Sequence, residues 1–267
     1  LAKEKKELYI QDKQNKDKTR KDKSSETITN DKLEFIDWSE FSDIDIIEEG
    51  VCGGKVCCIS VMYKESKYIL KEMRASMNYG KDYILIDQCK RIFGLRDMNM
   101  KRIKSNKGQL KIDPSKISFV NNVKIGDKEC IYCMMDYWEN IGDLGKHKDY
   151  MKDESVKKEA LKIRLFDGLF RSSDNILRNI LVNTKGELLS IDEGDIFGKR
   201  INIFNKNDYL RDNCSKELIT EVLDELLSDE HNKMAYVKDR FLTYGFTNYG
   251  KFVTRWSLYK LIVFNEL

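Results

Sequence analysis

Three polar residues in the second half of the sequence have the types and the spacing of a metal-assisted reaction site. Asp174 and Asn179 lie five positions apart in a polar segment, and Asp192 follows farther along the chain. Between Asn179 and Asp192 come two apolar runs, 180–182 and 188–191, which are joined by a polar stretch that contains glycine. Because a β-hairpin returns the end of its second strand to the start of its first, we expect the three side chains to converge.

Two carboxylates and one amide at such a site suit phosphoryl transfer, in which a protein mainly positions groups and stabilises charge. Asn179 and Asp192 would supply oxygen ligands that hold Mg²⁺ on the phosphates of a nucleotide. Asp174 would orient or deprotonate the hydroxyl group that accepts the phosphoryl group. The alternative interpretation is that all three are ordinary turn residues, since Asn and Asp are favoured in turns.

The same segment resembles the protein-kinase-like superfamily, in particular its atypical members, the phosphoinositide 3- and 4-kinases and the actin-fragmin kinase type. Asp174-x-x-x-x-Asn179 resembles the catalytic loop of that superfamily, and 191–197 resembles the phosphoinositide-kinase form of its metal-binding segment. The chain departs from the family at Asn175, where a basic residue is favoured, and at Glu193, where Phe is usual. The resemblance implies ATP and Mg²⁺ as cofactors and a protein or lipid hydroxyl group as the acceptor.

The resemblance assigns two further charged residues in the first half of the chain. The run 68–71 resembles the strand whose lysine contacts the α- and β-phosphates, so Lys71 is the expected phosphate lysine. A solvated lysine at a strand end is the alternative. The family's lysine pairs with an acidic residue on the following helix, and Asp87 is preferred because it lies close to the apolar face. Asp82, near the N-terminal end of that helix, is the alternative, where it would complement the helix dipole.

Two other segments are assigned to the nucleotide. Gly50, Gly53 and Gly54 lie between two predicted strands, and glycine would allow the backbone to approach phosphates closely. An ordinary hairpin turn is the alternative, because the spacing does not match G-x-G-x-x-G. Met135 and Asp136 end an apolar run where the resemblance implies the segment that binds adenine through backbone groups, and the alternative is the end of a core strand.

The elements that must position these residues change in type along the chain. The first half of the sequence contains apolar runs typical of strands and one segment with a helical period. The second half has helical periods throughout, and only the hairpin interrupts them. The expected strands are 44–48, 55–63, 67–72, 117–123 and 128–137, and the expected helices are 81–95, 155–170, 216–227 and 236–267. This order predicts an α+β, two-lobed protein-kinase-like fold with a β-rich N-lobe, a mainly helical C-lobe and a cleft between them.

We expect the chain to be divided into three parts. Residues 1–32 are dense in Lys and Asp with almost no large apolar periodicity, which predicts a charged flexible or peripheral tail. Its lysines are interpreted as serving solubility rather than binding to nucleic acid or a membrane. Residues 33–138 are expected to form the N-lobe and residues 139–267 the C-lobe.

The composition disfavours several classes of protein. With 48 basic and 45 acidic residues the net charge is +3, so there is no electrostatic footprint for nucleic acid, and no nucleic-acid partner is expected. No stretch approaches the roughly 20 apolar residues of a transmembrane helix, and the opening residues lack the apolar core of a secretory signal.

The seven cysteines, mostly in apolar runs, indicate reduced thiols and an intracellular, reducing compartment. Cys130 and Cys133 form a CxxC that is interpreted as core packing rather than a zinc site.

The leading functional hypothesis is an atypical serine/threonine protein kinase. A phosphoinositide or small-molecule kinase is the first alternative. The segment after Asp195 is short and has no Ala-Pro-Glu-like motif, which argues against a conventional eukaryotic protein kinase. A pseudokinase that acts as a binding scaffold is the second, because of Asn175 and Glu193. Four basic residues after the metal-binding segment could contact an anionic headgroup or an acidic peptide, or could be scattered surface charge: Lys199, Arg200, Lys206 and Arg211.

Overall fold

The computed structural model describes most of the chain, and all of the described residues belong to one compact unit, Lys32–Leu267. The described ranges are 33–46, 58–73, 75–106, 129–170, 177–192, 196–197, 203–204 and 208–267. Four predicted site residues lie outside these ranges, namely Gly50, Gly53, Gly54 and Asp174. The predicted tail, 1–32, and the predicted strand 117–123 also lie outside them.

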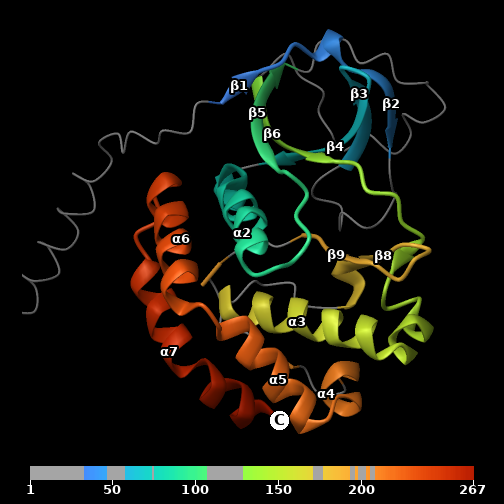
Figure 1. The fold of residues 1–267 in the computed structure, drawn as a ribbon. Coiled ribbons are helices and arrows are strands. Elements are labelled where there is room, and N and C mark those ends of the chain that lie inside the picture. The colour runs from blue at the N-terminus through green and yellow to red at the C-terminus, as the bar shows by residue number, and fades with distance from the viewer. Residues whose placement is uncertain are drawn as a thin grey trace, which may run out of the picture. The chain divides into compact units, whose positions relative to one another are not determined.

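The first half of the described chain forms a six-stranded sheet (Figure 1). Its strands are β1 (Glu34–Phe35), β2 (Ser42–Ile46), β3 (Cys58–Tyr63), β4 (Ser66–Met73), β5 (Lys101–Asn106) and β6 (Glu129–Asp136). They lie in the order β1-β5-β6-β4-β3-β2, and every neighbouring pair is antiparallel except β1 and β5. Strand β6 therefore lies between β5 and β4.

Both faces of the central strand β6 are buried, which explains why this strand appears in the sequence as an apolar run. Along β6, Tyr132 and Met134 belong to a small core with Trp38, whereas Cys133 and Met135 belong to a larger core with the helices. Successive side chains of a strand point to opposite faces, so a strand covered on both sides needs no polar alternation. The burial of Cys133 agrees with the predicted core packing of that thiol.

Strand β6, which lies within the predicted strand 128–137, has a partner on each edge. Its residues 131–134 pair with β4 on one edge and with β5 on the other. A strand has two edges, so none remains along 131–134 for a third partner. Strand β5 was missed because its sequence is mostly polar, with Ile103 as its fully buried apolar residue.

Helix α2 (Lys81–Ile92) confirms the helix predicted at 81–95 and follows a short 3-10 helix, η3 (Ala75–Gly80). Figure 1 shows α2 between the sheet and the C-terminal helices. Its buried residues belong to the same core as those helices. Phe93, just after α2, packs against Phe166 with 5.1 Å between the ring centroids. The first half of the chain is therefore joined to the second through a shared core around α2.

The second half of the described chain is mainly helical. Its longer elements are α3 (Glu154–Phe170), α4 (Tyr209–Asn213), α5 (Lys216–Leu227), α6 (Glu230–Thr243) and α7 (Tyr249–Glu266). A small sheet in the order β7-β8-β9 consists of Gly142–Asp143, Ile180–Val182 and Leu188–Ser190. Short 3-10 helices lie at Trp38–Glu40, Lys148–Lys152 and Leu177–Asn179. The predicted α+β class, β-rich first and mainly helical second, is confirmed and is consistent with a kinase-like two-lobed fold.

The prediction of one helical stretch over 236–267 is wrong, because two helices, α6 and α7, cover these residues. Gly245 adopts a φ of +73°, and the N–H of Phe246 donates to the carbonyl of Phe241 at 2.8 Å. A glycine in the left-handed region followed by such a backward hydrogen bond is a common way to end a helix. Among the residues that the structure describes, no helix combines the length and apolar character needed to span a bilayer.

Candidate active site

Lys71 of β4, Tyr83 of α2 and Asp192, which follows β9, contact one another. The Lys71 ammonium forms an ion pair with Asp192 Oδ1, and the Tyr83 hydroxyl donates to the same oxygen at 3.0 Å. Lys71 Nζ also lies 4.8 Å from the centroid of the Tyr83 ring. The structure therefore brings together two of the residues predicted from the sequence, Lys71 and Asp192, and adds Tyr83, which the sequence analysis did not assign.

The strand β4 directs Lys71 toward this site. Leu70 is buried in the small core on the far face of the sheet, so Lys71 points to the opposite face. Lys71 lies opposite Cys133 of β6, whose side chain packs in the core that contains α2. The Lys71 side chain is 11% exposed. The alternative interpretation, a solvated lysine at a strand end, therefore does not describe this residue.

The β8–β9 hairpin positions Asp192. Its turn is held by the Asn183 side chain, whose Oδ1 accepts hydrogen bonds from the backbone N–H groups of Lys185 and Glu187. Gly186 adopts a φ of +80°, which glycine allows without strain. The hairpin was predicted for these residues, and the structure confirms it.

Asn179 and Asp192 lie at the same end of this hairpin. The backbone N–H of Ile191 donates to the carbonyl oxygen of Asn179 at 2.8 Å, one step beyond the pairing of Ile180 with Ser190. Asn179 is half-buried, in the 3-10 helix Leu177–Asn179. The predicted convergence of these two positions is therefore present in the backbone, while Asp174 lies outside the described residues.

Asp192 has a φ of +63°, in the left-handed region that few residues other than glycine adopt. Asp and Asn occupy this region more readily than other residues with side chains, because their short polar groups can bond locally. Asp192 lies two residues after the end of β9, directly beside Lys71. The side chain of Asp192 remains 33% exposed, so one part of the carboxylate faces solvent.

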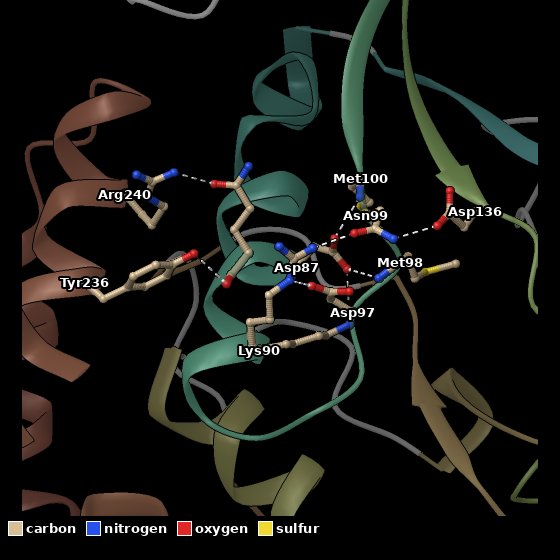
Figure 2. Close-up of polar contacts among 11 residues, drawn as sticks. Asp87, Lys90, Asp97, Met98, Asn99, Met100, Asp136, Tyr236 and Arg240 are labelled. Carbon is tan, nitrogen blue, oxygen red and sulfur yellow. Dashed lines mark hydrogen bonds and ion pairs between the residues drawn. The ribbon is translucent and has the colours of Figure 1, made fainter. Parts of the chain in front are cut away.

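Asp87, predicted as the acidic partner of Lys71, has other partners. Its two carboxylate oxygens accept hydrogen bonds from the backbone N–H groups of Met98 and Met100, at 2.8 and 2.9 Å (Figure 2). Its Oδ1 also lies 3.9 Å from the Lys90 ammonium. The prediction that Asp87 faces inward is correct, since the residue is 1% exposed. It faces the segment that leads into β5, however, and the pairing with Lys71 is corrected.

The alternative acidic residue, Asp82, lies in the first turn of α2 and accepts a hydrogen bond from the Asn78 amide at 3.1 Å. The ion pair of Lys71 is made with Asp192 and not with either of these aspartates. Tyr83 lies four positions before Asp87 and therefore on the same face of the helix. This spacing of four residues is the sequence signal that points to Tyr83 as a neighbour of the site.

A buried polar network surrounds Asp87. Burial raises the pKa of the Asp87 carboxyl, and this effect outweighs the lowering by Lys90 and by the N–H groups of Met100 and Met98. Lys90 is fully buried, and its ammonium donates to the carbonyl oxygen of Ser190 at 2.8 Å. Helix α2 is thus bonded to the strand β9, which ends two residues before Asp192. The sequence analysis did not identify Lys90.

The segment predicted to bind adenine is linked to α2 by the same network. Met135 is buried, whereas Asp136 is exposed and accepts a hydrogen bond from the Asn99 amide at 2.6 Å (Figure 2). The N–H of Asp136 donates to the Met98 carbonyl at 2.9 Å, and the N–H of Tyr137 donates to that of Lys67 at 3.1 Å. Both of these backbone donors are therefore engaged within the chain.

Helix α2 is also bonded to the C-terminal helices. The Tyr236 hydroxyl donates to the Gln88 carbonyl at 3.2 Å, and the Arg240 guanidinium donates to the Gln88 side-chain oxygen at 3.1 Å. Figure 2 shows α6 on the side of α2 that faces away from the 97–100 segment. The helix that carries Tyr83 is therefore held from two sides.

Comparisons with known proteins leave the family of the chain open. No protein-family model matches the sequence, and a search of the curated proteins finds no match. A solved structure described as "WaaP in complex with acyl carrier protein" is similar over 73% of this chain and 86% of that chain. The two are 11% identical, with a TM-score of 0.37. A likeness this distant says nothing about the reaction.

The donor set at the candidate site has the chemistry of a nucleotide-linked magnesium site. Among the described residues, no group of three or more His, Cys, Asp or Glu side chains could hold a metal ion. Mg²⁺ in nucleotide enzymes is usually bound by one or two protein oxygens together with phosphate oxygens and water. Asn179 and Asp192 carry an amide and a carboxylate oxygen and lie at the same end of the hairpin, and the Lys71 cation, a group that suits phosphate, contacts Asp192. These residues fit such a group.

Proposed function

We propose that this chain is an ATP-dependent phosphotransferase that moves the γ-phosphoryl group of Mg·ATP to a hydroxyl acceptor, as an atypical serine/threonine protein kinase. The observation that carries the proposal is the contact between Lys71 and Asp192, which lie 121 positions apart in the sequence. A cation for phosphate and a carboxylate for the metal are the two charged groups that phosphoryl transfer requires at close range.

Each residue has a distinct role in the proposal. Lys71 binds the phosphates, and Asn179 and Asp192 hold the metal. Mg²⁺, when bound, neutralises charge that develops on the phosphate oxygens. Asp174 orients the acceptor hydroxyl and accepts its proton, a role that depends on the sequence pattern because this residue lies outside the described ranges.

The nucleotide-covering loop and the adenine segment complete the proposal. Gly50, Gly53 and Gly54 are assigned to the phosphates, again from the sequence. Met135 and Asp136 are assigned to adenine. Because the N–H groups of Asp136 and Tyr137 donate within the chain, adenine recognition there would use backbone carbonyl groups, or would require these two hydrogen bonds to open.

A pseudokinase that acts as a scaffold is the second candidate, and two observations favour it. The ion pair with Lys71 occupies one oxygen of the proposed metal ligand Asp192, and two backbone donors of the adenine segment are engaged within the chain. A phosphoinositide or small-molecule kinase is a third candidate, which shares the site and differs in the acceptor.

The test is transfer of label from the γ-phosphate of ATP by the full chain, with Mg²⁺ and separate pools of protein and phosphoinositide acceptors. The wild type should label protein, and Lys71→Met and Asp192→Asn should abolish the labelling. The control Asp224→Asn makes the same chemical change at an exposed aspartate paired with Lys260, and should label like the wild type. Labelled lipid without labelled protein would favour the lipid kinase. Nucleotide binding without any transfer would favour the pseudokinase.

A further inference from the structure

Tyr83 is the residue of α2 that contacts both charged members of the candidate site. We propose that Tyr83 is a positioning residue, which holds Lys71 with the face of its ring and Asp192 with its hydroxyl group. The two contacts of Tyr83 are present in the structure. Their effect on the binding of Mg·ATP rests on the proposed function.

The two contacts of Tyr83 differ in chemistry. Its hydroxyl is a donor to an ionised oxygen at 3.0 Å, and hydrogen bonds to charged groups are stronger than those between neutral groups. Its ring lies 4.8 Å from the Lys71 ammonium, within the range in which the negative face of an aromatic ring attracts a cation. Tyr83 is 7% exposed, so water competes little with either contact.

The partner that α2 presents to Lys71 is the neutral side chain of Tyr83 and not a carboxylate. The two aspartates of α2 that were candidates for pairing with Lys71 accept hydrogen bonds elsewhere, Asp82 from Asn78 and Asp87 from Met98 and Met100. The negative charge that Lys71 meets is that of Asp192, and its other contact is the Tyr83 ring. The helix thus orients Lys71 without adding a carboxylate beside the proposed metal ligand.

This arrangement has a consequence for binding. A divalent cation held by Asp192 would weaken the ion pair between that carboxylate and the Lys71 ammonium. The ring of Tyr83 would continue to attract the ammonium and would keep it at the site for contact with phosphate. The hydroxyl keeps Asp192 oriented, as groups that hydrogen-bond a metal-ligating carboxylate do in other sites.

Two substitutions separate the two contacts. Tyr83→Phe keeps the ring and removes the hydroxyl, whereas Tyr83→Leu removes both. Tyr79→Phe is the matched control, because Tyr79 is 45% exposed on η3. Thermal unfolding of each full-length variant without ligand establishes that it folds.

The first measurement needs no nucleotide. Trace acetylation with acetic anhydride, read by mass spectrometry, gives the reactivity of Lys71 relative to the exposed Lys152, whose side chain is 78% exposed. Loss of the ring in Tyr83→Leu should raise this ratio by about 2-fold or more, because the ring covers and stabilises the ammonium. Tyr83→Phe and Tyr79→Phe should leave it near the wild-type value. An unchanged ratio in Tyr83→Leu would overturn the role of the ring.

The second measurement is calorimetric titration of ATP at a series of Mg²⁺ concentrations. Tyr83→Phe should raise the half-saturating Mg²⁺ concentration about 10-fold or more while the protein's melting temperature stays close to wild type. Tyr83→Leu should also weaken nucleotide binding by about 2- to 30-fold. A merely structural role would instead lower the melting temperature without moving the Mg²⁺ midpoint of Tyr83→Phe, and that outcome would overturn the role of the hydroxyl.

A double-mutant cycle identifies the group through which the ring acts. In a Lys71→Met background, Tyr83→Leu should weaken nucleotide binding no more than Tyr83→Phe does, because the cation that the ring holds is absent. If Tyr83→Leu exceeds Tyr83→Phe by the same amount in both backgrounds, the role of the ring is contradicted. If the wild type binds no Mg·ATP, the proposed function fails, and the acetylation ratio still decides whether Tyr83 positions Lys71.

Discussion

The buried ammonium of Lys90 donates a hydrogen bond to the carbonyl oxygen of Ser190 at 2.8 Å. This bond joins α2, which follows the first four strands, to β9, the strand that ends two residues before Asp192. The Lys90 ammonium also lies 3.9 Å from Asp87, which accepts hydrogen bonds from the segment that leads into β5. One buried cation therefore connects three elements around the candidate site.

Lys90→Met should lower the free energy of unfolding strongly, by about 3–5 kcal/mol, because it leaves the buried Asp87 carboxylate without its cation. Because Asp87 still accepts hydrogen bonds from two backbone N–H groups, we expect the loss of stability to lie toward the lower end of that range. Urea denaturation of the full chain measures it. The control is Lys260→Met, which removes an exposed lysine from a surface ion pair and should change stability little. Equal effects of the two substitutions would show that the Lys90 contacts do not hold the elements together.

The pKa of Asp87 predicts a specific pH dependence. Burial raises this pKa, so the folded chain binds a proton more readily than the unfolded chain. Stability then falls as pH rises from about 3.9, the ordinary aspartate pKa, through the raised folded value, and stays lower above it. Each unit of difference corresponds to about 1.4 kcal/mol.

Asp87→Asn removes this titration, and urea denaturation between pH 4 and pH 7 measures the result. The stability of Asp87→Asn relative to the wild type should therefore rise with pH across that window and then level off. Tyr79→Phe, which changes no carboxylate, should reproduce the wild-type profile. A relative stability that is constant or that falls with pH would contradict the assignment.

Gly80→Ala tests the close contact at the start of α2. Gly80 has a φ of +78°, and an added Cβ would lie 2.5 Å from Cys133 Sγ and 2.9 Å from Met73 Cγ. The left-handed backbone costs about 1–2 kcal/mol for a residue with a side chain, and overpacking costs about 1–3 kcal/mol more. Differential scanning calorimetry measures the fall in melting temperature.

The control for Gly80→Ala is Gly250→Ala, in the first turn of α7, where nothing lies within 4 Å of an added Cβ. Alanine favours a helix over glycine by about 0.8–1 kcal/mol, so this variant should be as stable as the wild type or slightly more stable. A Gly80→Ala variant that melts like Gly250→Ala would mean that α2 begins farther from β6 than the structure has it.

Substitutions at Asp192 should separate chemistry from backbone strain. Asp192→Asn keeps a residue that tolerates the φ of +63°, whereas Asp192→Ala does not, so the alanine variant should be less stable by about 1–2 kcal/mol. Phosphoryl transfer should fall by more than about 100-fold in both, because both lose the proposed metal ligand. Assays of γ-phosphate transfer and urea denaturation measure the two effects. Activity that survives in Asp192→Asn would remove Asp192 from the metal site.

The parts of the fold that local interactions specify were predictable. The hairpin before Asp192 was found from its apolar runs and turn, because Asn183 and Gly186 satisfy that turn within a few residues. Helix α2 was found from its apolar period. Strand β5 was not, because its polar sequence becomes a strand only when β6 supplies the hydrogen bonds. The break between α6 and α7 was also missed, although Gly245 marks it.

The choice of partners in the site was not predictable to the same degree. The sequence supported Lys71 and Asp192 as the charged residues, and the structure brings them into contact across 121 positions. The spacing of four residues places Tyr83 and Asp87 on one face of α2, but it does not decide that Tyr83 lies beside Lys71 while Asp87 bonds to Met98 and Met100. Residues on the same helix face differ by a rotation of a few tens of degrees, which packing against neighbouring elements decides.

The sequence by itself therefore determined the residue types available for chemistry, the α+β order of elements and the turn that precedes Asp192, because these depend on short-range preferences of the backbone. Only the tertiary structure decided which inward side chain of α2 meets Lys71, and that Lys90 bonds to Ser190 across 100 positions. The physical reason is that a buried polar group must find its partner wherever packing places one.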